Sequence, residues 1–398
     1  MPDAIYRLNQ KKPHLLTLII MSSFASMGAV IFMPALSKIS DYFQITTNHS
    51  QLIITLFLVG YALGQLFYGP LANRLGRKRA FYVGIAIATL GSIVSILSEP
   101  LNSFTLLIFG RLLEALGSSA GLVISYAMIN DYYYPTEARR VISFMTLAFA
   151  IMPGIATFVG SLLITYFSWL SCFYFMLFYG LTLIIPVRYL EETATVLDKN
   201  ALHFKDIKEH DKHVLENRTF RHASFLLGLN TMCIYVFAGS VPLIAIRYLG
   251  IAPATYGVIG LIPFIGTALG SITSGHLSKY CSAETLVKAC FVIELLVSIA
   301  IAIFFYLGIV NMTVLMVCGF IFMFACCMMG ANLASIASGI VDDKANGAAV
   351  MNFFSIGIAM CGTFVLALTP GSQIFKMPFL FLGAMALMLV VAWVHKRR

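Results

Sequence analysis

Three ionisable side chains, Arg111, Glu114 and Glu294, lie inside long apolar stretches of the sequence. A charge at membrane depth costs roughly 2.5–3.5 kcal/mol, so such groups usually face a cavity or a partner. Arg111 and Glu114 are three residues apart, which places both on one face of a helix. At about 1.5 Å of rise per residue, Glu114 would lie about 16 Å inside its apolar run. Glu114 could therefore exchange a proton while Arg111 keeps the site polar.

A permanent ion pair that braces a helix bundle is the alternative for these two residues. For Glu294 we expect a structural partner rather than a role in chemistry. The eight cysteines fall mostly inside apolar runs and form no C-x-x-C pair or cysteine–histidine cluster. They are therefore interpreted as small packing residues, and the sequence predicts no metal site and no cofactor.

The composition decides the class of protein. Of the 398 residues, 60% are hydrophobic and only 11% are charged, whereas a soluble domain has about 25% charged residues. Too few charges are present to cover a water-soluble surface, which excludes soluble enzymes, nucleic-acid readers and disordered chains. The sequence predicts an integral membrane protein.

Apolar runs long enough to cross a bilayer as helices occur twelve times. The longest polar segment, 190–221, separates six runs from six more, so we predict an all-α membrane protein with an N-terminal half (1–189), a linker and a C-terminal half (222–398). The runs are 14–37, 50–72, 79–98, 103–130, 140–166, 168–189, 222–246, 255–277, 285–308, 311–339, 345–368 and 375–395.

The placement of lysine and arginine predicts the orientation. An even number of spans puts both chain ends on one side, and nearly all of the 26 basic residues fall there. The opposite side would hold only Lys38, Arg247 and Lys376, and Arg111 lies within a span. Because basic loops stay in the cytoplasm, we expect both termini there. This asymmetry also explains the net charge of +9 without a nucleic-acid partner.

The loop after the second run carries a recognisable signature. Residues 69–79 read GPLANRLGRKR and resemble the G-x-L-x-D-R-x-G-R-K signature of the major facilitator superfamily. The stretch 111–117 is similar to the arginine motif of its drug:proton antiporters, and 33–36, 130–133 and 167–169 are similar to the Bcr/CflA subfamily. A helix cap or a solvated charge is one interpretation of Asp131; the alternative, which the resemblance implies, is a cytoplasmic gate in which Asp131 meets Arg74 or Arg77. Its residues would be Gly69, Asn73, Arg74, Gly76, Arg77 and Asp131.

Two departures from the family pattern concern charge. Asn73 stands where the loop signature has aspartate, so it can accept a hydrogen bond but supplies no charge. Members of the subfamily carry an acidic residue in the first span, four before the proline, and here that position is Val30. The usual proton carrier is therefore missing.

In the family fold the first, fourth, seventh and tenth spans line a central cavity. The resemblance thus implies that Arg111 and Glu114 face this cavity and form the site of proton coupling. It also selects polar or aromatic residues of these spans as substrate contacts, although packing is the alternative for each aromatic ring. They are Ser118, Tyr126, Asn230, Tyr235 and Asn332.

The resemblance implies a transporter that works by alternating access. It would be a proton-coupled exporter of small amphipathic compounds and would act as a monomer in a bacterial inner membrane. Its partners would be a small-molecule substrate, protons and lipid. The alternative is a carrier of the same fold for one metabolite or siderophore, as exporter, importer or uniporter. A membrane-embedded enzyme is disfavoured, since no H-E-x-x-H or phosphate-binding loop occurs.

Overall fold

The computed structural model describes residues 13–194, 197, 216–340 and 344–397. This part of the chain is almost entirely helical and contains no strand. Twelve helices in it are long and apolar enough to cross a membrane. In lipid every backbone polar group must be paired within the chain, and a helix does this locally. The predicted all-α architecture of twelve spans is confirmed.

The first half holds six candidate spans. The first is broken after Val30, where Pro34 lies in a short 3-10 turn instead of continuing the helix, because proline lacks an N–H donor. The elements are α2 (Leu15–Val30), η1 (Met33–Ala35), α3 (Leu36–Tyr42), η2 (His49–Gln51), α4 (Leu52–Leu75), α5 (Arg77–Leu97), α6 (Phe104–Ser118), α7 (Ala120–Tyr132), α8 (Pro135–Tyr166) and α9 (Ser171–Arg188).

The second half repeats this plan with six more candidate spans. Its first helix ends in a π-helical turn that carries Arg247. The elements are α11 (Arg218–Leu243), η3 (Ile244–Tyr248), α12 (Pro253–Ile259), α13 (Leu261–Leu277), α14 (Ala283–Tyr306), α15 (Met312–Ser338), α16 (Lys344–Leu368) and α17 (Gln373–Arg397).

Local sequence signals fix several helix ends. The Ser103 hydroxyl accepts a hydrogen bond from Leu106 N (3.3 Å) at the start of α6, and Asn311 Oδ1 accepts one from Val314 N (2.9 Å) at the start of α15. Such caps satisfy amides that have no partner inside the helix. α8 begins at Pro135, five residues before the predicted start, because proline is favoured in the first turn.

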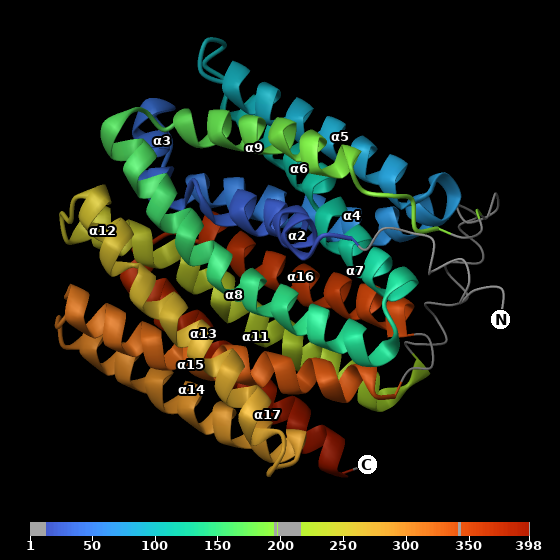
Figure 1. Ribbon diagram of the computed structural model, residues 1–398. Helices are drawn as coiled ribbons and strands as arrows, with labels where there is room; N and C mark the ends of the chain where they lie inside the picture. The colour runs from blue at the N-terminus through green and yellow to red at the C-terminus, as the bar shows by residue number, and fades with distance from the viewer. Residues whose placement is uncertain (1–12, 195–196, 198–215, 341–343, 398) are drawn as a thin grey trace.

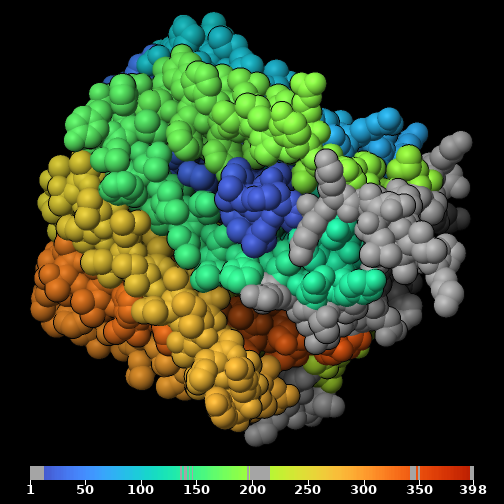
Figure 2. Space-filling view, in the orientation of Figure 1, coloured from blue at the N-terminus to red at the C-terminus, as the bar shows by residue number. Residues whose placement is uncertain are grey.

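The two halves pack side by side. In Figure 1 the blue-to-green first half lies above the yellow-to-red second half, and the start of α2 and the end of α17 lie at the same end of the bundle. α8 contacts α12 and α13, and α4 contacts α16. Figure 2 shows the seam where the green surface of α8 meets the yellow surface of α12 and α13.

Glycines bring α5 and α6 close together. A Cβ atom on Gly91 would collide with the backbone nitrogen of Glu114, and one on Gly117 would collide with that of Ala88. Helices in lipid associate through such close packing, which favours small residues at their interface. The backbone of Glu114 is thereby held against α5.

Part of the sequence prediction lies outside the described residues. The linker 190–221 is described only at 190–194, at 197 and from 216 onward, and α11 already begins at Arg218. The predicted orientation also depends in part on basic residues outside the described part of the chain, namely Arg7, Lys11, Lys12 and Arg398.

Candidate functional site

The ion pair between Arg111 and Glu114 is the central feature of the first half. Arg111 Nη1 lies 2.8 Å from Glu114 Oε2, one turn apart on α6, and neither side chain has any exposed surface. A buried ion pair is tolerated only when its geometry is good and its other polar atoms are satisfied. Glu114 Oε1 nevertheless finds no hydrogen-bond partner among the described residues. The pair is thus enclosed but incompletely satisfied.

Aromatic rings and one backbone carbonyl surround the Arg111 guanidinium. Its central carbon lies 4.1 Å from the ring centroid of Phe32 and 4.3 Å from that of Phe57. Arg111 Nη2 also donates a hydrogen bond to the carbonyl oxygen of Gly28 (2.5 Å). The faces of aromatic rings attract a cation, and the attraction grows when water is excluded. These contacts hold the positive charge in a dry environment.

All of these contacts to Arg111 come from α2, the turn that follows it, and α4, in the first half. The family resemblance implies that the pair faces a central cavity, and in this conformation both side chains are fully enclosed. The rings of Phe32 and Phe57, which the sequence analysis did not single out, cause this enclosure. No local signal marks them, because they are two of 32 phenylalanines.

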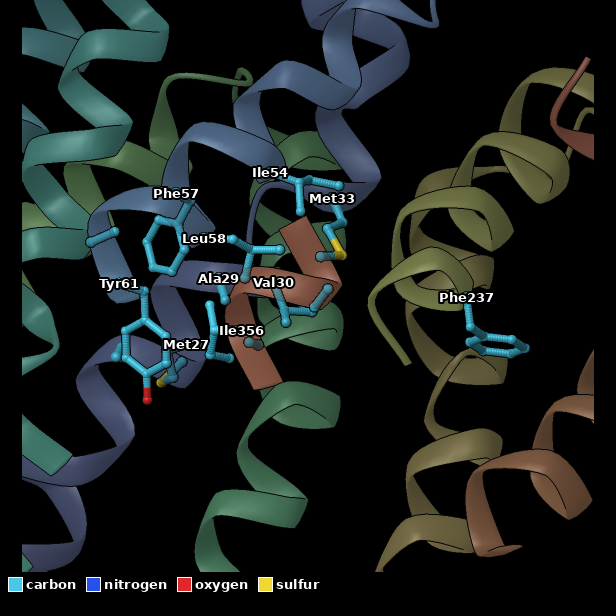
Figure 3. Packing of buried hydrophobic residues seen from close by; sticks show 14 of the residues in the cluster. Met27, Ala29, Val30, Met33, Ile54, Phe57, Leu58, Tyr61, Phe237 and Ile356 are labelled. Carbon is cyan, nitrogen blue, oxygen red and sulfur yellow. The ribbon is translucent and has the colours of Figure 1, made fainter. Parts of the chain in front are cut away.

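Val30 occupies the position at which the subfamily carries an acid. Its side chain is 5% exposed. Figure 3 shows it among apolar side chains of the first half, with Ile356 of the second half close by. The first span therefore presents no ionisable group at this point, where the first half faces Ile356 of the second half.

Three tyrosines from both halves lie near one another. Tyr61 of α4 lies within electrostatic reach of Tyr126 of α7 and Tyr235 of α11. Tyr61 is 4% exposed, and Gln65, four residues further along α4, lies close to its hydroxyl. Tyr61, which the sequence analysis missed, thus lies near two predicted substrate contacts, Tyr126 and Tyr235.

The other predicted substrate contacts lie within helix–helix packing. Ser118 is buried and donates to the carbonyl of Ala115 in its own helix (3.4 Å). Asn230 Nδ2 donates to the carbonyl of Cys326 (2.9 Å), which joins α11 to α15. Asn332 Nδ2 donates to Ser274 Oγ (2.9 Å) on α13. In this conformation Asn230 and Asn332 each join two helices, whereas Ser118 bonds within its own helix and Asn230 Oδ1 has no partner among the described residues.

Glu294 of α14 is completely buried. Its carboxyl group lies within hydrogen-bonding reach of the Cys326 thiol on α15, and it belongs to none of the ion pairs found among the described residues. Its ionisable neighbours are the thiols of Cys233, Cys290 and Cys326. The described part of the chain brings no three His, Cys, Asp or Glu residues into a geometry that could hold a metal. For Glu294 the sequence analysis expected a structural partner; its nearest candidate among the described residues is the Cys326 thiol.

The signature residues 69–79 form a polar network at the end of the bundle that carries the termini; they are the last turns of α4, Gly76 and the start of α5 rather than an extended loop. Arg77 Nε lies 2.9 Å from Asp131 Oδ2, and Arg77 Nη1 donates to Asn73 Oδ1 (2.6 Å). The Glu192 carboxylate accepts hydrogen bonds from the backbone nitrogens of Arg77 (2.8 Å) and Lys78 (3.1 Å). The structure therefore selects Arg77 of the two possible partners of Asp131, and it adds Glu192 to the network.

The remaining residues of the predicted gate differ in their surroundings. Gly76 has a φ of +93°, and a Cβ there would clash with the Glu192 carboxylate. Only glycine adopts this backbone conformation easily. Arg74 is exposed, and a Cβ on Gly69 would meet open space. Sterics thus require glycine at Gly76 but not at Gly69.

Hydrogen bonds join the two halves at the opposite end of the bundle. Arg247 Nη1 lies 2.7 Å from Asp41 Oδ1. Gln51 Nε2 donates to the carbonyl of Gly239 (2.9 Å), and Thr55 Oγ1 donates to Thr363 Oγ1 (3.0 Å). Asp41, Gln51 and Thr55 belong to the first half and their partners to the second. These contacts close this end of the bundle.

A match to a family model identifies the superfamily of this chain. Residues 18–227 match the model described as Major Facilitator Superfamily, which is more than half of the chain. The chain belongs to this superfamily. It is therefore a membrane transporter, not an enzyme, and the sequence-based assignment is confirmed.

Curated relatives support the predicted branch of the superfamily. The chain is 25% identical over 317 residues to multidrug resistance protein D of Escherichia coli strain K12, covering 79% of this chain and 78% of the relative. It is 26% identical over 298 residues to a bicyclomycin resistance protein homolog of Haemophilus influenzae, covering 73% of each. These names agree with the predicted resemblance to Bcr/CflA-like drug:proton antiporters.

Solved structures support the fold. The crystal structure of a D-xylose–proton symporter superposes with a TM-score of 0.76 at 11% sequence identity, covering 96% of this chain and 97% of that chain. An inward-open structure of the xylose transporter XylE from E. coli superposes with a TM-score of 0.73 at 12% identity, covering 94% and 95%. Identities this low support the shared fold alone.

Proposed function

We propose that this transporter exports small amphipathic compounds in exchange for protons, and that Glu114 is the proton carrier. The names of the curated relatives favour drug efflux. The observation that carries the proton role is the enclosed Arg111–Glu114 pair, in which one carboxylate oxygen has no partner. An ionisable group at membrane depth marks a functional site by default.

The charge of the pair links proton binding to conformation. The carboxylate and the guanidinium together are neutral, which suits a dry enclosure. A proton on Glu114 would leave the Arg111 cation unpaired, and a buried charge without its partner costs several kcal/mol. The protonated state therefore favours a conformation in which water or an anionic group reaches Arg111. By linkage, a substrate that favours that conformation also favours proton binding.

Alternating access requires that the two ends of the bundle open in turn. The bonds made by Asp41, Gln51 and Thr55 hold one end closed, so the other state of the cycle must break them. At the opposite end, Asn73, Arg77 and Asp131 would act as the gate, with Gly69, Arg74 and Gly76 as further residues of the loop. The tyrosines at 61, 126 and 235 would contact substrate, since aromatic faces bind planar or cationic molecules.

Transport into liposomes by the purified protein tests this proposal. We expect an imposed pH gradient to drive accumulation of some members of a panel of dyes and antibiotics. Glu114→Gln should abolish the response to the gradient and leave counterflow of the same compound intact, because glutamine keeps the shape but cannot carry a proton. Unchanged coupling in Glu114→Gln would exclude the proton role.

Glu294→Gln provides the matched control, because Glu294 is the other carboxyl that is fully buried at membrane depth. We expect this variant to keep its response to the pH gradient. If both variants lose coupling equally, burial of a carboxyl rather than the Arg111–Glu114 pair is what matters, and the assignment to Glu114 is wrong.

Val30 favours a second candidate function. Without a carboxylate in the first span, the chain could carry one metabolite or siderophore as a uniporter or importer that does not use protons. Counterflow of a single metabolite, indifferent to pH, with no transport of the drug panel, would support this candidate against the first.

We further propose that the protein resides as a monomer in a bacterial inner membrane with both termini in the cytoplasm. The distribution of lysine and arginine supports this orientation. Protease digestion of a C-terminal tag tests it: the tag should be cut in inside-out vesicles and protected in right-side-out vesicles. The mass of the detergent-solubilised protein by light scattering tests the monomeric state.

A further inference from the structure

A groove of about 430 Å³ lies where α11, α16 and α17 come together. Its apolar wall is formed by Phe354 of α16 and by Val390, Val391 and Val394 of α17. The three valines lie in the last apolar span, at the end near which the chain terminates (Figure 1). The groove thus extends from the edge of the hydrocarbon region toward the polar end of the bundle.

Basic side chains line the polar rim of this groove. Arg218, Arg221 and His222 occupy the first turns of α11, at positions i, i+3 and i+4, and therefore share one face of the helix. None of the groove-lining residues is acidic. One Arg218 nitrogen donates to the Val394 carbonyl oxygen (3.3 Å), which holds this guanidinium at the edge of the groove and leaves further N–H donors.

Ser224 supplies an independent observation. It lines the same groove and is 2% exposed, and its hydroxyl has no hydrogen-bond partner among the described residues. A buried polar group without a partner destabilises the folded state. Such groups are rare in folded proteins unless water or a ligand satisfies them.

We propose that this groove binds one anionic phospholipid. The phosphate would lie between Arg218 and Arg221 and reach the Ser224 hydroxyl, and an acyl chain would pack along Phe354 and the valines of α17. Basic pockets between membrane helices are suited to acidic headgroups. Arginine matches phosphate especially well, because its planar fork can donate two parallel hydrogen bonds. A zwitterionic lipid carries no net negative charge and gains less from two arginines.

Tryptophan fluorescence can test this proposal with the full-length protein. The chain has only two tryptophans, and Trp393 is adjacent in sequence to the groove residue Val394. Trp169 lies in the turn between α8 and α9, in the other half, and can be replaced by phenylalanine. The protein is reconstituted with increasing fractions of brominated phosphatidylglycerol or brominated phosphatidylcholine. We expect Trp393 to be quenched at much lower fractions of the brominated phosphatidylglycerol.

Replacing both arginines should remove this selectivity. Each basic residue near an anionic lipid contributes on the order of a fivefold preference, so Arg218→Gln with Arg221→Gln should lower it by about thirty-fold. Arg79→Gln with Lys279→Gln is the matched control, because it removes two exposed charges outside the groove. Ser224→Ala should reduce the preference by a smaller factor.

Two results would overturn the proposal. One is equal quenching of Trp393 by the two brominated lipids in the otherwise unmodified protein, a result that does not depend on the stability of any arginine variant. The other is an equal loss of preference in the groove variant and in the control variant, which would assign the selectivity to overall charge.

Discussion

Breaking the buried ion pair from one side should destabilise the protein far more than removing the pair as a whole. In Arg111→Met the Glu114 carboxyl loses its ion-pair partner in a fully enclosed site, and the expected cost is about 3–5 kcal/mol. Glu114→Met should cost a similar amount, because the guanidinium loses its only carboxylate. The double variant replaces both charges with apolar side chains of similar length, and we expect its stability to lie within about 1 kcal/mol of the parent.

The measurement is a double-mutant cycle on the free energy of unfolding, with unfolding in mixed micelles followed by far-ultraviolet circular dichroism. The exposed pair between Arg247 and Asp41 is the control, since their side chains are 48% and 65% exposed. Disrupting such a surface pair typically costs about 0.2–1 kcal/mol. If the substitutions at Arg111 and Glu114 each cost less than about 1 kcal/mol, and if their costs simply add in the double variant, then water reaches the pair and our account of its enclosure is wrong.

Three further variants test other parts of the structure. Gly28→Ala should lower the free energy of unfolding by about 1–3 kcal/mol, because its Cβ would lie 3.2 Å from Glu114 Oε1 in an already filled site. Gly357→Ala is the control and should not destabilise the protein, because a Cβ there meets open space. Thermal unfolding compares the two variants. Gln51→Ala should weaken the closed end by about 0.5–1.5 kcal/mol, since it removes a buried hydrogen bond between the two halves, and spin-label distances across that end should lengthen. Asn73→Asp should strengthen the contact with Arg77 by up to about 1 kcal/mol and slow transport, while an unchanged rate would contradict a gating role.

Much of the architecture could be predicted from the sequence, because the signals for membrane helices are local. Apolar length predicts a span wherever it occurs, and capping residues such as Ser103 and Asn311 mark helix starts. The contact between Arg111 and Glu114 was also predictable, since two residues three apart on one helix meet whatever the helix packs against.

Contacts between distant segments could not be predicted in the same way. The rings of Phe32 and Phe57 surround Arg111 only because α2 and α4 pack against α6. Composition gives no reason to select these two rings among so many. The expectation of an open chamber beside Arg111 came from the family fold, and it did not include the side chains that close this site in the present conformation.

The sequence by itself determined how many helices are long and apolar enough to cross the membrane and which charges are carried into the apolar region. These properties depend on hydrophobic length and helical periodicity, which neighbouring residues set. The tertiary structure alone decided which end of the bundle is closed, that Glu294 is buried among cysteines, and that Arg218, Ser224 and Val394 share one groove. Such arrangements depend on how helices far apart in the chain pack together, and packing is a property of the whole bundle rather than of any one segment.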